Sequence, residues 1–184
     1  MYSDRTDRAS QRAETLYTIG YALREAMKNA TLCFLIRRGG TDSVLLGLKK
    51  RGFGQGKFNG FGGKIEAGED ARAAAVREVA EESGLVVQPE DLAPAGHVTF
   101  YFPADSAYDH DVTLFVATAW RGEPRETEEM RPAWFAADGL PFDDMWQDDA
   151  EWLPHVLAGR VIEAEFAFAE DNETVARSSI RIIS

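Results

Sequence analysis

The chain has 184 residues, of which 45% are hydrophobic and 28% are charged, and its formal net charge is −11. This length suits one well-packed domain and is short for two full ones. So acidic a protein repels the nucleic-acid backbone, which disfavours a non-specific DNA or RNA binder. No apolar run approaches the roughly 18 residues that a transmembrane helix needs. We therefore expect neither a nucleic-acid partner nor a membrane partner.

Cysteine usage and the N-terminal residues indicate a cytoplasmic protein. A single cysteine, Cys33, cannot form an intrachain disulfide, which fits a reducing cytosol. The first twelve residues are polar, and their arginines alternate with Asp4 and Asp7, which is typical of neither a signal peptide nor a transit peptide. The three histidines are widely spaced and offer no zinc signature.

The first predicted element is an amphipathic helix over about residues 9–28. Its apolar residues recur at three- and four-residue spacing, namely Leu16, Ile19, Leu23 and Met27. Gly20 weakens this prediction, at a cost of about 1 kcal/mol relative to alanine. The apolar stripe either docks on the domain or on a second subunit, or the segment is a frayed leader. We treat residues 1–28 as an N-terminal extension and residues 29–184 as the domain.

Two strands are predicted next, over residues 31–36 and 43–48, across a glycine-containing turn at residues 38–42. The following glycine-rich stretch, residues 52–63, is too loose in composition for regular structure throughout. A helix is predicted over residues 69–83, because the segment opens with acidic residues and a glycine follows its end.

Strands alternate with one more helix in the rest of the chain. Branched and aromatic residues predict strands over residues 85–87, 96–102 and 111–120, then a helix over residues 149–157, then strands over residues 161–169 and 175–183. No repeat, low-complexity tract or linker divides the chain. The pattern is α+β, a mixed sheet with a few helices packed on it.

Three glutamates in the helix over residues 69–83 carry the strongest chemical signal. Glu78, Glu81 and Glu82 stand at positions i, i+3 and i+4, so their carboxylates share one helix face. Their charges repel one another unless a cation lies between them, and oxygen-only ligands favour Mg²⁺ or Mn²⁺. The alternative is a solvated acidic face, which leaves the surrounding glycines and arginine unexplained.

Residues 63–85 match the motif G-x5-E-x7-R-E-U-x-E-E-x-G-U, where U is aliphatic, at every fixed position. On this motif the chain resembles the Nudix hydrolases. The resemblance implies a Nudix fold, an α/β/α sandwich around a mixed β-sheet. It also implies that Glu78, Glu81 and Glu82 bind metal ions, that Glu69 pairs with Arg77 to hold the loop, and that water attacks a phosphorus atom.

A narrower resemblance covers about residues 31–168. Three stretches, residues 46–64, 129–135 and 141–149, are similar to the oxidised purine nucleoside triphosphatases of animals. The chain departs from them in three places, with Phe58 in place of a tryptophan, Gln147 in place of a proline, and His110 near a pocket methionine.

This narrower resemblance implies a set of site residues. Thr31, Lys49 and Asn59 would line the nucleoside pocket, and Phe61, Gly62, Gly63 and Lys64 would border the phosphates. Trp146 would stack on the base, Phe53 and Phe100 would be further pocket walls, and Asp148 and Asp149 would read the base edge. The Gly62 carbonyl and Glu129 would complete the metal shell, and Glu81, Glu82 or Glu129 would act as the base. Helix capping by the two aspartates and core packing of Trp146 stay open as alternatives.

The implied reaction is hydrolysis of oxidised purine nucleoside triphosphates, such as 8-oxo-dGTP and 2-hydroxy-dATP, to the monophosphate and pyrophosphate. Alternatives are a Nudix enzyme for a dinucleoside polyphosphate, a nucleotide sugar or capped RNA, and a non-catalytic module that senses a nucleotide. The expected partner is a small-molecule nucleotide, and the expected assembly is a monomer or homodimer.

Overall fold

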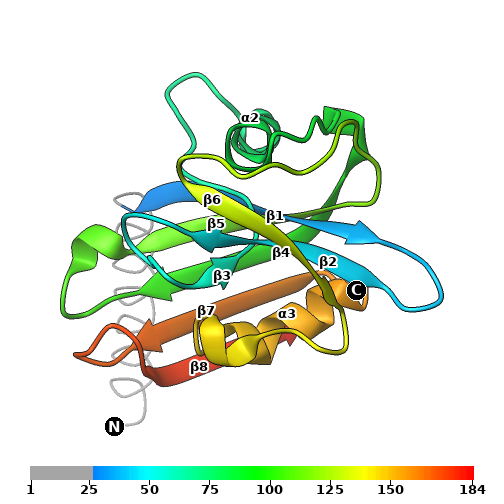
Figure 1. Cartoon of the computed structure of the whole chain (residues 1–184). Coiled ribbons are helices and arrows are strands. Elements are labelled where there is room, and N and C mark those ends of the chain that lie inside the picture. Colours follow the sequence, from blue (N-terminus) through cyan, green and yellow to red (C-terminus); the bar gives the residue numbers. More distant parts are fainter. Residues whose placement is uncertain (1–26) are drawn as a thin grey trace, which may run out of the picture.

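An eight-stranded mixed sheet organises residues 27–184, the part of the chain that this computed structural model describes (Figure 1). The strands are β1 (Lys28–Arg37), β2 (Ser43–Lys49), β3 (Phe58–Asn59), β4 (Leu92–Tyr101), β5 (His110–Ala117), β6 (Met130–Ala136), β7 (Ile162–Phe168) and β8 (Val175–Ile182). Their order is β3-β2-β1-β5-β4-β7-β8, with β6 paired to β2. The β1–β5 and β4–β7 pairs are parallel, and the other pairs are antiparallel.

Within residues 27–184, two α-helices cover opposite faces of this sheet, α2 (Ala71–Ser83) and α3 (Asp149–Leu157). Short 3-10 turns lie in the connections, namely η1 (Pro89–Asp91), η2 (Ser106–Tyr108) and η3 (Phe142–Asp144). Alternate residues of β1 show the two layers. Leu32 and Phe34 pack with Trp152 of α3, while Cys33 and Leu35 pack with α2. Because successive strand residues point to opposite faces, both faces of β1 are buried from Ala30 to Ile36, and Thr31 is the one polar residue of that run. The expected α/β/α sandwich is confirmed.

Helix α2 begins and ends where its caps dictate. Asp70 accepts a hydrogen bond from the Ala73 amide at 2.7 Å, which satisfies one of the free N–H groups of the first turn. Gly84 adopts a left-handed φ of 74° and donates its amide to the Ala80 carbonyl, as glycine does at helix ends. The predicted helix end is correct, whereas the predicted start, Glu69, lies two residues too early.

Several element predictions were wrong in detail. Residues 85–87 form a single bridge, Val86 to Arg121, and no strand. Strand β4 starts at Leu92, ahead of the predicted Gly96, because a bulge between Pro94 and Gly96 lets pairing continue. Strand β6 was not predicted, since Pro132 interrupts it. A proline is tolerated there because β6 pairs with β2 alone among the described strands.

The predicted N-terminal helix falls almost wholly on residues outside the described part of the chain. Its last residue, Lys28, is the first residue of β1 and pairs with His110. The division of the chain at residue 28 stays a prediction.

Loop residues 61–65 lie along the free half of β1, and this contact positions the site. Strand β2 pairs with β1 only from Leu35 onward. Before that point the Thr31 amide donates to the Gly63 carbonyl at 2.8 Å, and the Cys33 amide donates to the Phe61 carbonyl at 2.7 Å. A Cβ on Gly62 would collide with the Thr31 carbonyl, so only glycine permits this close approach.

Candidate active site

Two carboxylates of α2 face the backbone of residues 62–63. Glu82 is 2% exposed, and its Oε2 accepts the Gly62 amide at 2.9 Å. The pKa of Glu82 is raised to about 8, chiefly by burial and to a smaller extent by the nearby charges of Glu78 and Glu129. Burial also raises the pKa of Glu78, and a Cβ on Gly63 would collide with that carboxylate. These crowded oxygens are a fitting donor set for a hard divalent cation, which would relieve their repulsion.

An arginine holds the loop that precedes α2. Arg77 binds both oxygens of Glu69, through Nε at 2.8 Å and Nη2 at 2.9 Å. This pairing lowers the pKa of Glu69 to about 2. Nη1 of Arg77 also donates to Glu78 at 2.8 Å, and Nη2 donates to the Lys64 carbonyl at 3.1 Å. These contacts join Arg77 to the loop before α2, where the motif implies a loop-holding role for it.

The other two expected metal ligands pair with arginines. Glu81 is exposed and lies 3.1 Å from Arg77 Nη1, and Glu129 is bound by Arg51. Over residues 27–184 no three His, Cys, Asp or Glu side chains are already gathered as a metal cage. Each of these carboxylates instead has a nearby arginine or backbone N–H as its partner.

A cavity of about 320 Å³ lies on the α3 face of the sheet. Its lining includes all of the predicted substrate-binding residues except Phe61: Thr31, Lys49, Phe53, Asn59, Gly62, Gly63, Lys64, Phe100, Trp146, Asp148 and Asp149. The Phe61 ring is instead fully buried with the residues under α2. Because Gly62 and Gly63 border both the cavity and the α2 carboxylates, the two parts of the site adjoin.

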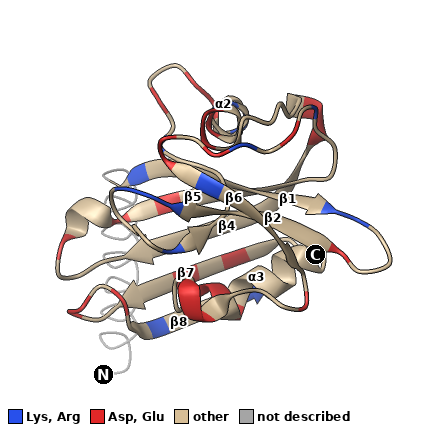
Figure 2. Ribbon diagram, in the orientation of Figure 1, with Lys and Arg blue, Asp and Glu red and all other residues tan. Residues whose placement is uncertain are grey.

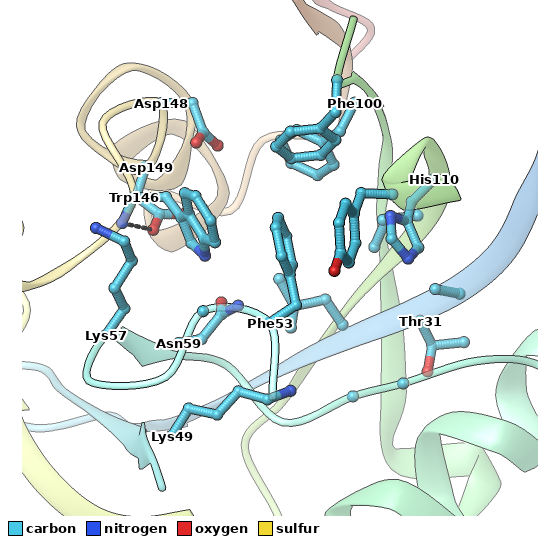
Figure 3. A pocket seen from close by; sticks show the side chains of 18 of the residues that line it. Thr31, Lys49, Phe53, Lys57, Asn59, Phe100, His110, Trp146, Asp148 and Asp149 are labelled. Carbon is cyan, nitrogen blue, oxygen red and sulfur yellow. Dashed lines mark hydrogen bonds between the residues drawn. The ribbon is translucent and has the colours of Figure 1, made fainter. Parts of the chain in front are cut away.

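Aromatic rings dominate the cavity, as Figure 3 shows for Phe53, Phe100 and Trp146. Sequence reasoning missed several lining residues, among them Lys57, Phe102 and Tyr108, and did not assign His110 a role. Phe102 could have been found, since it follows Phe100 by two residues and a strand puts both on one face. Tyr108 belongs to η2, a turn that no periodicity predicts.

The adjacent aspartates at the start of α3 are both 2% exposed. Asp148 makes no side-chain capping bond. Its Oδ2 accepts the Trp152 indole N–H at 2.8 Å, and its Oδ1 is buried without a hydrogen-bond partner. Asp149 accepts the Trp146 amide at 3.1 Å. Burial raises the pKa of Asp148 to about 6, and burial and the Asp148 charge raise the pKa of Asp149. The pair can therefore hold a proton near neutral pH.

Lysines offset the negative charge of the molecule at the cavity. Acidic residues gather at the start of α3 (Figure 2), yet Lys49, Lys57 and Lys64 line the cavity. The hydroxyl of Thr31, a second lining residue with a buried oxygen, also lacks a partner. Buried polar atoms left unpaired are costly, so those of Thr31 and Asp148 point to a polar ligand.

Helices long and apolar enough to cross a membrane are absent from residues 27–184.

Comparison with known proteins identifies the family. A NUDIX domain model matches residues 27–156. The oxidized purine nucleoside triphosphate hydrolase of Mus musculus is 46% identical, over 75% of this chain and 86% of that protein. The protein of the same name from Danio rerio is 45% identical, over 77% of this chain and 86% of that protein. The crystal structure of a MutT protein from Bacillus halodurans shares the fold, with a TM-score of 0.70 and 24% identity over 84% of this chain and 97% of that one. The chain belongs to the Nudix hydrolases.

Proposed function

We propose that the protein hydrolyses oxidised purine nucleoside triphosphates, such as 8-oxo-dGTP and 2-hydroxy-dATP, to the monophosphate and pyrophosphate. One observation carries the proposal. An aromatic cavity that contains the buried pair Asp148 and Asp149 adjoins the α2 carboxylates across Gly62 and Gly63. A planar base with polar edges suits the first part, and a triphosphate suits the second. The two similar animal proteins bear the name of this activity.

Nudix hydrolases use divalent metal ions, and we propose Mg²⁺ as the ion here, with Mn²⁺ as a substitute. Glu78 and Glu82 would bind the ion together with the Gly62 carbonyl. Glu81 and Glu129 would exchange their arginine partners for the ion and complete its ligand set. A bound ion would neutralise the charge that builds up on the phosphates. The proton of the attacking water would pass to Glu81, Glu82 or Glu129.

A substrate panel tests this function. Purified protein in Mg²⁺ is offered 8-oxo-dGTP, 2-hydroxy-dATP, dGTP, a dinucleoside polyphosphate, a nucleotide sugar and capped RNA, and pyrophosphate and phosphate are measured separately. We expect pyrophosphate from the two oxidised triphosphates at the highest kcat/KM. Preference for another substrate would contradict the proposal, and binding without turnover of any would identify a sensing module. The complete set of motif carboxylates opposes that last outcome.

We also propose a cytoplasmic monomer or homodimer. The only cysteine, Cys33, is fully buried, and burial raises the pKa of its thiol to about 12. A protonated, buried thiol is chemically inert.

A further inference from the structure

Three aromatic rings form a stack in the cavity. The Phe53 ring lies 4.2 Å from the Tyr108 ring, at an interplanar angle of 15°, and 5.0 Å from the Trp146 ring, at 29°. Both pairs are stacked, with their rings close to parallel. Figure 3 shows Phe53 projecting into the middle of the cavity beside Trp146. Phe53 therefore fills a space one aromatic ring thick between Tyr108 and Trp146.

This arrangement leaves Trp146 no free face for a base. The Nζ atom of Lys57 lies 5.0 Å from the centre of the Trp146 ring, a cation–π contact, and Phe53 stacks on the same ring. Asp148 and Asp149 lie in the same cavity, on the segment that carries Trp146. A base that reaches these aspartates and stacks on the face of Trp146 that Phe53 covers must therefore take the place of Phe53.

The position of Phe53 in its loop allows its side chain to move out of the cavity. Its side chain is 37% exposed, and its neighbours Gly52 and Gly54 have positive φ values of 76° and 78°. The base of the loop is fixed, because the Lys49 amide donates to the Lys57 carbonyl at 3.0 Å. Only the tip of the loop needs to move, as hinged loops do when a ligand enters.

We infer that Tyr108 and Trp146 are the two walls of a stacking slot for the purine base, and that Phe53 closes this slot until a nucleotide displaces it. The inference rests on the proposed function and deepens it. Tyr108 becomes a base-binding residue, and Phe53 becomes a competitor of the base, whereas the sequence had assigned Phe53 as a wall. Stacking admits any purine, so discrimination of the oxidised base falls to the aspartates.

Binding of 8-oxo-dGMP, which lacks the scissile bond, tests the slot by calorimetry. Phe53→Ala removes the ring that competes with the base. We expect the Kd of this variant for 8-oxo-dGMP to fall by about three- to tenfold, the range that one aromatic stack represents. A wall role predicts the opposite sign. Tyr108→Ala removes a wall, and we expect its Kd to rise by about five- to tenfold. Tyr108→Phe keeps the ring and should bind like the wild type.

The outcomes separate the slot from the function. If the wild type binds 8-oxo-dGMP, yet Phe53→Ala binds more weakly and Tyr108→Ala is unchanged, the slot is refuted and the function stands. If the wild type prefers unmodified dGMP and the variants respond as expected, the slot stands and the oxidised-base function fails. A wild type that binds no purine nucleotide refutes both. Phe53→Leu, which retains apolar volume, and thermal melting of each variant control for folding.

Discussion

At the scale of single residues, Glu82 is a carboxylate whose charge the fold disfavours. It is buried, its pKa is raised to about 8, and its hydrogen-bond donor is the Gly62 amide. Glu82→Gln preserves the shape and the acceptor but removes the charge. We expect kcat/KM in Mg²⁺ to fall by about 100-fold or more, as when charge stabilisation is lost.

The same substitution should leave the fold intact. Because burial disfavours the ionised form, the melting temperature of Glu82→Gln in a chelator should equal or exceed that of the wild type. Glu90→Gln, at an exposed residue of η1, is the matched control and should change neither quantity. Near-normal turnover by Glu82→Gln would show that this carboxylate holds no metal ion.

Asp148 and Asp149 allow a prediction about substrate choice. A proton shared by the two carboxyls lets the pair offer one donor and one acceptor, and the proton can shift to suit the base. Asparagine fixes the donor at one position. Asp148→Asn and Asp149→Asn should therefore change kcat/KM for 8-oxo-dGTP and 2-hydroxy-dATP unequally, by about tenfold in their ratio, the value of one hydrogen bond to a charged group. Equal losses on both substrates would contradict the shared proton.

At the scale of elements, the contact between loop residues 61–65 and β1 links the metal site to the cavity. Gly62→Ala would push its Cβ against the Thr31 carbonyl and loosen the Gly62 amide from Glu82. We expect a loss of about 1–3 kcal/mol in the free energy of unfolding, typical of overpacking, together with lower kcat/KM. Urea unfolding measures the first quantity. Gly40→Ala has open space around its Cβ and should stay within about 0.5 kcal/mol of wild type; equal stabilities of the two variants would contradict the argument.

How far the sequence predicts an element depends on where its determinants lie. Helix α3 was predicted with the correct bounds, and α2 with the correct end, because periodicity and caps are local signals. Strand β6 was missed because its partner, β2, lies about eighty residues earlier in the chain, and because Pro132 interrupts its run of strand-forming residues.

The site likewise contains a part that local sequence signals predict and a part that depends on long-range contacts. The carboxylates of α2 could be assigned within a single motif, since a helix brings neighbouring turns together. The cavity gathers Thr31, Phe53, Tyr108 and Trp146 from distant segments, and no spacing rule relates them. Resemblance supplied three of the four. The place of Phe53 between two rings is a tertiary fact that no sequence pattern encodes.

At the scale of the whole molecule, the buried aspartates make stability depend on pH. The folded-state pKa of Asp148, about 6, exceeds its ordinary value of 3.8. Between these two values the folded protein binds more protons than the unfolded chain, so the contribution of Asp148 to stability falls as pH rises through this window.

Replacing Asp148 should remove its contribution to the pH dependence of the free energy of unfolding. We expect the loss in free energy of unfolding between about pH 4 and pH 6 to be smaller in Asp148→Asn than in the wild type, by urea unfolding at a series of pH values without metal. Asp144→Asn is the matched control, because Asp144 is exposed and lies four residues away in η3. Parallel curves for the wild type and Asp148→Asn would mean that Asp148 stays ionised in the folded protein over this pH range.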